Sequence, residues 1–355
     1  MVPPAADALA APPLAPVEGR VFAWRRIVAL GGGTGLPVVL RGLSASLATA
    51  GGDGRAAPDR ERLTAIVTVA DDGGSSGRLR RAYGIRPPGD VRNCLLALSE
   101  HPGTLASLFG YRFDGDGEVA GHSLGNLILA ALSRIESGFE RAVQAAGDIL
   151  GVSGRVLPAT AEAVALEAEF EDGTRIRGES RIAAQRRRIR RIRLRPEAAP
   201  ALPQALEAIA GADCIVLGPG SLYTSLIPVL LVQGLADAIG ASHARVVLVM
   251  NLMTEPGETD GHSAPDHLLA LRAHAPDLPV HDVIVNATPL TERVRRRYAL
   301  QGAYPLSIER EALEAFGCRV RVADLLAAGP KVRHDAPRLG RAILDLASEP
   351  AIVNP

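Results

Sequence analysis

Residues 27–37 of this 355-residue chain read IVALGGGTGLP. Four apolar residues run into three glycines, a threonine and a fourth glycine, and apolar residues then resume at helical spacing. This order predicts a buried strand, a tight turn and the start of a helix. Glycine lets a backbone bend sharply and approach a ligand, and free N–H groups at a helix start favour an anion. We therefore expect a phosphate-bearing ligand at Gly32, Gly33, Thr34 and Gly35.

The turn matches neither of the two standard phosphate-binding patterns. Counted from Gly31, the dinucleotide pattern GxGxxG needs a glycine where Leu36 stands, and the Gly-Lys-Ser/Thr of a P-loop is absent. A tight strand-to-helix turn without a ligand is the alternative interpretation.

Three further predicted strands end in polar or glycine-rich clusters. Leu63–Ala70 is followed by Asp71 and Asp72, Cys214–Leu217 by a second glycine loop, and Arg245–Met250 by Asn251. In an open α/β sheet, ligands lie beyond the carboxyl ends of the strands. The residues expected to contribute from the second glycine loop are Gly218, Gly220 and Ser221.

The adjacent carboxylates of Asp71 and Asp72 suit several roles. They can accept hydrogen bonds from a ribose, or hold Mg²⁺ through water to a diphosphate, because Mg²⁺ keeps several waters and takes few carboxylates. Ordinary turn chemistry is the alternative, since Asp and Gly are common turn residues.

Two predicted helices add polar candidates. Asp90 is placed to cap a helix over residues 91–100, with Arg92 and Asn93 in its first turn. The helix dipole disfavours a basic residue there, so Arg92 is either near an anion or simply exposed. Asn126 lies in a second predicted helix, which runs to about Ile135, and indicates close packing or a polar contact at the site.

The alternation of strands and helices predicts a doubly wound, mostly parallel α/β sheet in one domain over residues 25–355. Two strand-like runs flank Asp172-Gly173, which is typical of a hairpin, and a basic stretch, Arg186–Arg195, follows. We expect an antiparallel β flap inserted at residues 155–197. The basic stretch lacks interleaved aromatic residues for base stacking, which favours a solvated strand face over a nucleic-acid surface.

Composition narrows the class of protein. The 39 basic and 39 acidic residues cancel, so net charge supplies no argument for binding nucleic acid or membranes. The three cysteines are far apart in apolar segments, which predicts buried free thiols and suits a reducing cytoplasm. No apolar run is long enough to span a membrane. Residues 1–24 are rich in Ala and Pro and are expected to be disordered.

Seven motifs together resemble the gluconeogenesis factor family (YvcK/GlmR), relatives of the 2-phospho-L-lactate transferase CofD. They are GGGTGLPVVLRGL from Gly31, VADDGGSSGRLR from Val69, PPGDVRNCLLALS from Pro87, GHSLGNLILAAL from Gly121, EDGTRIRGES from Glu171, GPGSLYTSLIP from Gly218 and NLMTEPGET from Asn251. The resemblance implies a Rossmann-like, CofD-like fold and a cytoplasmic protein that binds UDP-N-acetylglucosamine or a related nucleotide sugar. It implies regulation of carbon flow towards peptidoglycan precursors and cell shape.

By position, the resemblance places ligand contacts at Thr34, at Asp71 or Asp72, at Tyr298 and at Arg333. The sequence departs from the family's pattern at Val229, where the family has an asparagine. The expected partners are an enzyme of amino-sugar synthesis and further copies of the same chain, with no nucleic acid and no required cofactor other than a possible Mg²⁺. Two classes of function stay open: a nucleotide-sugar sensor, and a CofD-type transferase that moves a phospholactyl or nucleotidyl group onto an acceptor.

Overall fold

The computed structural model describes residues 25–50, 59–99 and 103–349 and contains a seven-stranded parallel sheet, as predicted. The strands lie in the order β10-β9-β8-β7-β1-β2-β3. Their bounds are β1 (Ile27–Gly31), β2 (Leu63–Val67), β3 (Arg155–Pro158), β7 (Cys214–Leu217), β8 (Arg245–Val249), β9 (Asp282–Asn286) and β10 (Arg319–Ala323).

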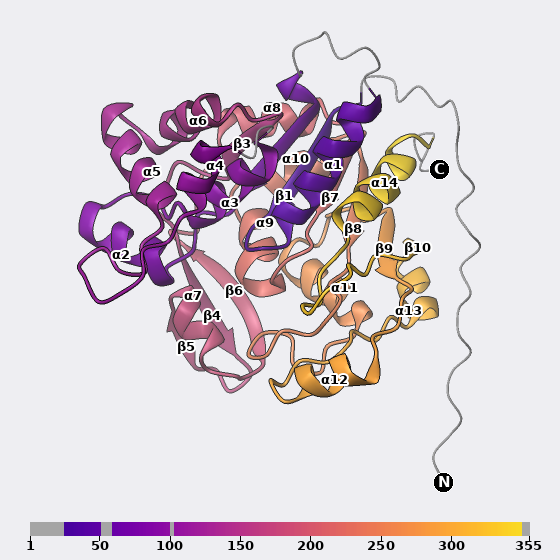
Figure 1. Cartoon of the computed structure of the whole chain (residues 1–355). Helices are drawn as coiled ribbons and strands as arrows, with labels where there is room; N and C mark the ends of the chain where they lie inside the picture. Colours follow the sequence, from indigo (N-terminus) through magenta and orange to yellow (C-terminus); the bar gives the residue numbers. More distant parts are fainter. Residues whose placement is uncertain (1–24, 51–58, 100–102, 350–355) are drawn as a thin grey trace.

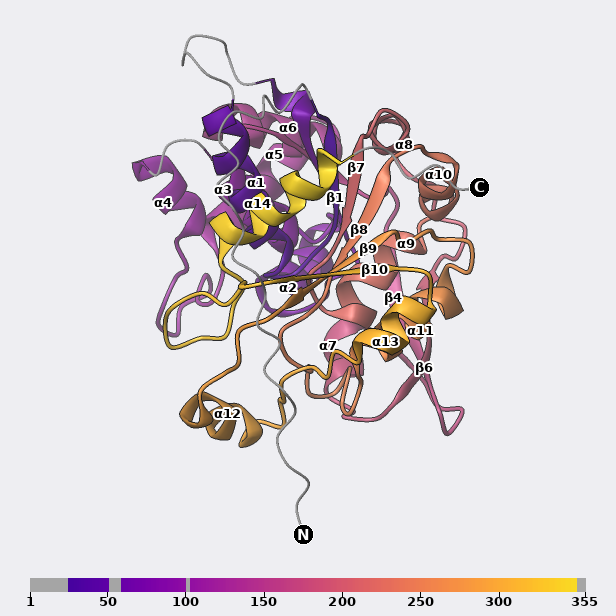
Figure 2. The same ribbon diagram turned by 90° about the vertical axis from the view of Figure 1, so that its right-hand side faces the viewer.

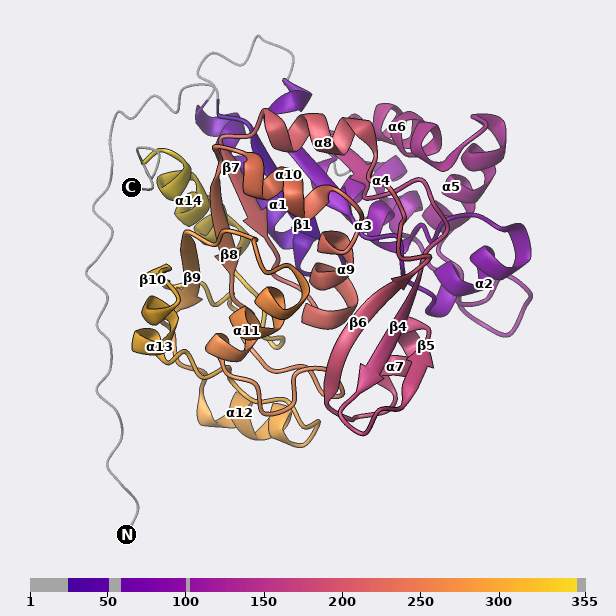
Figure 3. The same cartoon turned by 180° about the vertical axis from the view of Figure 1, so that it is seen from behind.

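Helices cover both faces of this sheet, because successive side chains of a strand point to opposite faces and here both sets are apolar. In β1, Ile27 and Ala29 enter one core and Val28 and Leu30 the other. Figure 1 shows α1, α3 and α14 over one face, and Figure 3 shows α8, α9 and α10 over the other. The fold is therefore doubly wound.

The helices are mostly short. Their bounds are α1 (Leu36–Ala50), α2 (Gly74–Tyr83), α3 (Gly89–Leu98), α4 (Thr104–Gly110), α5 (Leu124–Ile135), α6 (Phe139–Leu150), α7 (Glu179–Ala183), α8 (Pro203–Ala210), α9 (Ile227–Leu230), α10 (Leu235–Ala241), α11 (Ala264–His274), α12 (Glu292–Ala299), α13 (Arg310–Ala315) and α14 (Ala336–Ala347). A 3-10 turn, η1 (Arg60–Arg62), precedes β2, and a π-helical turn, η2 (Leu222–Leu226), precedes α9.

Strand β1 lies at the point where the order of the strands in the sheet reverses. The chain passes from β1 to β2 and β3 on one side, and β7, β8, β9 and β10 continue on the other side. Strand β1 pairs in parallel with both β2 and β7, so the turns that follow β1 and β7 meet at one edge. Such a switch point is where open α/β sheets bind ligands.

The antiparallel insertion is present, in the order β5-β4-β6, with β4 (Ala165–Phe170), β5 (Arg175–Arg177) and β6 (Ile189–Arg195). The boundary expected at residue 155 is too early, because β3 pairs with β2 in the main sheet. Carboxylates of β4 face the basic stretch: Glu169 pairs with Arg193 at 2.9 Å, and Glu167 pairs with Arg195 at 2.6 Å. Three buried apolar cross-strand pairs hold the other face of this sheet in the core.

One local expectation needs correction: the predicted strand Leu63–Ala70 ends at Val67. Helices α9 and α10 are separate, because the chain turns between them and Gly234 takes a left-handed φ of +90°. The three cysteines are buried free thiols, as expected. Within residues 25–50, 59–99 and 103–349, no helix is long and apolar enough to cross a membrane.

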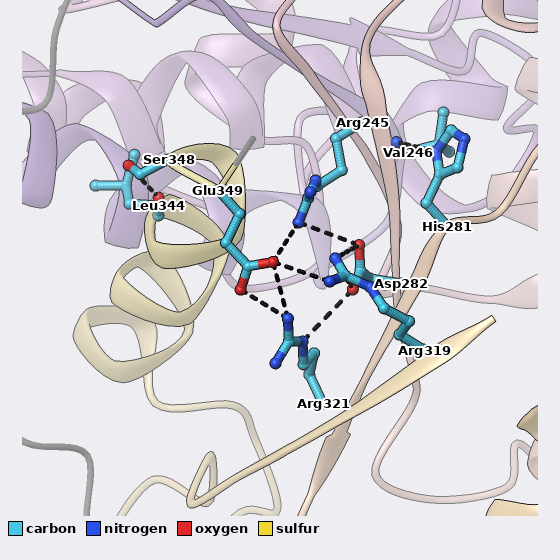
Figure 4. Close-up of polar contacts among 9 residues, drawn as sticks. All are labelled: Arg245, Val246, His281, Asp282, Arg319, Arg321, Leu344, Ser348 and Glu349. Carbon is cyan, nitrogen blue, oxygen red and sulfur yellow. Dashed lines mark hydrogen bonds and ion pairs between the residues drawn. The ribbon is translucent and has the colours of Figure 1, made fainter. Parts of the chain in front are cut away.

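A network of charged side chains lies at the amino ends of β8, β9 and β10, at the opposite end of the strands from the switch point (Figure 4). Asp282, the first residue of β9, is fully buried and lies 2.8 Å from Arg319. Glu349, just after α14, pairs with Arg245 at 2.8 Å and with Arg321 at 2.6 Å. The network ties the end of the last helix to the first residues of three strands.

Candidate functional site

A cavity of about 400 Å³ opens beyond the carboxyl ends of β1, β7 and β8. We call it the switch-point cavity. Residues from five segments far apart in the sequence line it: Thr34, Gly35, Pro37, Val38, Arg41, Asn93, Leu96, Pro219, Gly220, Ser221, Asn251, Leu252, Met253, Glu255, Val332, Arg333 and His334. Six of the predicted ligand-binding residues are among them: Thr34, Gly35, Gly220, Ser221, Asn251 and Arg333.

The two glycine loops form one wall because they touch through their backbones. A Cβ atom on Gly35 would lie 2.2 Å from the carbonyl oxygen of Pro219, so only glycine fits there. Asn251 braces the second loop: its Nδ2 donates to the Gly220 carbonyl at 2.9 Å, and its Oδ1 accepts from the Gly220 N–H at 3.1 Å. Gly218, with a φ of +68°, begins that loop.

The cavity carries two guanidinium groups. Burial and then the neighbouring charge of Arg333 lower the pKa of Arg41. Across the three described ranges, neither Arg41 nor Arg333 forms an ion pair. Burial lowers the pKa of His334 to about 4, so this imidazole is neutral at pH 7. The site therefore attracts anions through two arginines.

One carboxylate faces the same space. Burial raises the pKa of Glu255, and a hydrogen bond from the Ser221 side chain opposes that rise. A carboxylate that accepts from one hydroxyl has remaining lone pairs for others. Glu255 is thus placed to accept hydrogen bonds from the hydroxyls of a sugar or a ribose.

Gly32 and Gly33 of the turn face the protein interior and do not line the cavity. The Gly33 N–H donates to Asp90 Oδ2 at 2.8 Å, and a Cβ atom on Gly32 would lie 2.6 Å from the same oxygen. The helix cap expected of Asp90 is therefore wrong, because its carboxylate binds the glycine turn and makes no cap on α3. Desolvation raises the pKa of Asp90 to about 6.

Asp71 and Asp72 do not line the switch-point cavity, and they have different neighbours. Asp72 Oδ1 accepts from the Ser180 N–H at 2.9 Å and from the Ser180 hydroxyl at 2.8 Å, which binds the antiparallel sheet to the main domain. Asp71 Oδ1 accepts from Gly73 N at 2.7 Å. Desolvation and the nearby carboxylates of Asp71 and Asp90 raise the pKa of Glu179.

These carboxylates make a negative zone beside the glycine turn. Like charges that share a site hold protons or attract a cation. In the part of the chain that the structure describes, no three His, Cys, Asp or Glu side chains are arranged to hold a metal ion by themselves. A cation here would therefore need further ligands from water or from a bound phosphate.

Three other predicted residues act on the framework of the site. Arg92 is buried and donates to Asn126 Oδ1 at 2.8 Å, and Asn126 donates to Ser75 Oγ at 3.1 Å. Arg92 is therefore neither exposed nor in the cavity. The Tyr298 hydroxyl accepts from the N–H of Val332 at 2.8 Å, so it holds the segment that carries Arg333. Val229 is fully buried in the core and does not line the cavity.

Sequence reasoning missed two residues of the site, Arg41 and Glu255. Arg41 had a detectable signal: it follows Val38 at helical spacing, so these two side chains share one face of α1, and Thr34 lies in the turn just before that helix. Glu255 lies in an irregular loop, and only the tertiary structure brings it to the cavity.

The chain is similar to known proteins in sequence and in fold. The family model for "2-phospho-L-lactate transferase CofD" matches residues 27–326. A gluconeogenesis factor of Halalkalibacterium halodurans is 44% identical over 323 residues, which cover 90% of this chain and 96% of that protein. The gluconeogenesis factor of Bacillus subtilis is 41% identical over 326 residues, which cover 91% of this chain and 98% of that protein.

A solved structure has the same fold. A member of the UPF0052 family from Bacillus halodurans superimposes with a TM-score of 0.83 at 44% identity, covering 90% of this chain and 99% of that one. A putative gluconeogenesis factor of a Nostoc strain is 45% identical over 92% of this chain, but these residues span 69% of that longer protein.

Proposed function

Because the chain belongs to the CofD family and to the gluconeogenesis factors within it, we propose that it is a regulatory protein that binds a UDP-sugar, namely UDP-N-acetylglucosamine. In this proposal it acts in the cytoplasm, linking carbon metabolism to cell-wall precursor synthesis and cell shape. The ligand would occupy the switch-point cavity.

The guanidinium groups of Arg41 and Arg333 carry the proposal. They come from α1 and from the segment before α14, both line the cavity, and neither pairs with a carboxylate of residues 25–50, 59–99 or 103–349. Two like charges in one cavity repel each other unless an anion lies between them. A diphosphate supplies such an anion, and the planar guanidinium suits phosphate oxygens.

The remaining contacts suit a nucleotide sugar. The backbone N–H groups near Thr34 and Gly35 lie at the start of α1, where the helix dipole favours phosphate. Glu255 and Ser221 would bind hydroxyl groups of the sugar or of the ribose. Tyr298 would act through the Arg333 segment, since its hydroxyl is already bonded to Val332.

One observation favours a sensor over a transferase. A CofD-type transferase must place a large aromatic acceptor beside the phosphate, and flat acceptors are bound by aromatic side chains. The residues that line the switch-point cavity include no Phe, Tyr or Trp. The transferase, moving a phospholactyl or nucleotidyl group, is the second candidate because of the family itself.

We also propose where Mg²⁺ would act if it accompanies the diphosphate. Asp71 and Asp90 would hold it through water, because Oδ1 of Asp72 already accepts two hydrogen bonds from Ser180. The ion would supply positive charge to the diphosphate. We expect EDTA to weaken the binding of UDP-N-acetylglucosamine; unchanged affinity in EDTA would remove Mg²⁺ from the proposal.

Calorimetry with UDP-N-acetylglucosamine, and with GDP as the competing ligand class, tests the function. Losing one charged hydrogen-bonding partner costs about 1.5–3 kcal/mol, so Arg333→Ala should weaken binding by roughly ten- to a hundredfold. Arg293→Ala, on exposed α12, is the matched control and should bind as the wild type does. Equal affinity in Arg333→Ala removes Arg333 from the site, and a preference for GDP supports the transferase.

The regulatory role requires a partner. We propose that this partner is an enzyme of amino-sugar synthesis. We also propose that the chain forms a homo-oligomer. Co-purification of that enzyme with the protein, in the presence and absence of UDP-N-acetylglucosamine, tests the first, and light scattering tests the second. The proposed partner is contradicted if no such enzyme co-purifies with the chain. The proposed oligomer is contradicted if the chain is a monomer both with and without the ligand.

A further inference from the structure

A second cavity of about 390 Å³ lies at the other end of the sheet, beyond β3. We call it the flank cavity. The segment after α2, the turn between α5 and α6, and the loop after β3 line it, and it shares no residue with the switch-point cavity. Figure 1 shows α2, α5 and α6 together on this flank, away from α12 and α14. Any ligand here is therefore separate from the nucleotide-sugar site.

Three arginines from three different segments line the flank cavity. Arg86 Nε donates to the Ala161 carbonyl at 2.6 Å, which holds that side chain against the loop after β3. Arg134 makes one long contact, 3.5 Å, to the Tyr83 carbonyl. Arg141 has no ion-pair partner among the residues that the structure describes.

The balance of charge in the cavity is positive. Glu140 is the one carboxylate in its lining, so three arginines against one glutamate leave a formal charge of +2. The 12-residue helix α6 also begins here, and its N-cap residue, Gly138, has no side chain to bond the free N–H groups of the first turn. Guanidinium groups and a helix start both favour an anion, and phosphate matches both.

The wall of the flank cavity includes apolar groups. Ile85, Phe139 and Pro158 line it beside the arginines, and Ile85 is buried. An inorganic ion would leave this surface without contacts, whereas a phosphate ester with a carbon body would cover it. The volume lies at the small end of the range for ligand sites.

We propose that the flank cavity binds a small phosphate monoester of sugar-phosphate size. Its phosphate lies between Arg134 and Arg141 at the start of α6, and its carbon body lies against Ile85 and Phe139. The proposal does not depend on the UDP-sugar function, because the two cavities share no side chain. It gives the protein a second metabolite input.

Calorimetry and thermal shift on the full chain test this, with glucose 6-phosphate as the probe and glucose and inorganic phosphate as comparisons. We expect glucose 6-phosphate to bind with a Kd on the order of 0.1–1 mM, more tightly than either comparison. Arg141→Ala should weaken binding about tenfold or more. Arg141 is exposed, so this variant should keep the wild-type melting temperature.

Cross-controls separate the two sites. Arg333→Ala and Arg293→Ala should bind glucose 6-phosphate as the wild type does, and Arg141→Ala should bind UDP-N-acetylglucosamine as the wild type does. The proposal is overturned if glucose 6-phosphate does not bind, if glucose binds equally well, or if Arg141→Ala binds it unchanged. Equal losses in Arg141→Ala and Arg293→Ala would also overturn it, since they would indicate general charge attraction.

Discussion

Replacing Arg41 by Gln should separate ligand affinity from stability. Without a ligand, the guanidinium groups of Arg41 and Arg333 share the switch-point cavity, and neither has a carboxylate partner in the described chain. Removing one of them relieves a repulsion, and pairs of partly exposed charges are worth about 0.2–1 kcal/mol. In a domain of this size, about 1 kcal/mol shifts the melting temperature by roughly 2 °C. The free Arg41→Gln protein should therefore melt at the wild-type temperature or up to about 2 °C higher.

The same change should weaken the complex. A hydrogen bond to a charged group contributes about 1.5–3 kcal/mol, so the Kd for UDP-N-acetylglucosamine should rise roughly ten- to a hundredfold. Raising the salt concentration should reduce the difference in Kd between the wild type and Arg41→Gln, because salt screens the attraction between Arg41 and the ligand in the wild type.

Paired calorimetry and thermal melts of the wild type, Arg41→Gln and the exposed control Arg293→Gln give both quantities. Affinity equal to the wild type would show that Arg41 does not face the ligand. A loss of more than about 1 kcal/mol in the free protein would show that Arg41 has a stabilising partner, and the reasoning about the cationic pair would fail.

Four further predictions concern the framework of the fold. Gly340→Ala should lower the unfolding free energy by about 1–3 kcal/mol in chemical denaturation, because a Cβ atom there would lie 2.3 Å from the carbonyl of Gly42 on the packed helix α1; wild-type stability would contradict this close contact. Asp282→Asn should lower it by about 3 kcal/mol, since it removes one of the two carboxylates that pair with the buried guanidinium of Arg245 and leaves Glu349 as the other; an unfolding free energy equal to that of the wild type would contradict this role. Arginine neighbours lower the pKa of Glu349 against the effect of its burial, so its contribution should be complete above about pH 4.5 and disappear as the pH falls, and Glu349→Gln should lack that part of the acid slope. The pKa of Asp90 is raised from 3.8 to about 6, so the folded chain holds that proton more tightly and stability should fall as the pH rises through this interval; Asp90→Asn should remove the fall, and an unchanged pH profile would refute the assignment.

The family and the binding edge of the fold were accessible from the sequence for a physical reason. A strand, a glycine turn and a helix start are local features, and each is encoded in about ten consecutive residues such as 27–37. The alternation of strands with helices then restricts the topology, because parallel strands need crossover helices and place their carboxyl ends at one edge. Thr34, Gly220 and Asn251 therefore lie at one cavity, as predicted.

The assignment of roles within the site depended on the tertiary structure. Asp71 and Asp72 are adjacent in sequence, yet Ser180 of the antiparallel insertion binds Asp72 and leaves Asp71 beside Glu179. Tyr298 was predicted as a ligand contact, and packing places its hydroxyl on the Val332 N–H. These contacts join segments that are far apart in the chain, and their partners follow from how helices and loops pack, which no local pattern encodes.

Figure 2 shows the same distinction in the last third of the chain. Helix α14 lies along α1, while α12 projects from the domain with no buried residue. The apolar spacing of α14 predicts a packed helix, since Leu339 and Ile343 fall on one face. Only the assembled fold brings Arg333 to the same cavity as Arg41. The two residues are far apart in the sequence, so their distance in space does not follow from their spacing along the chain.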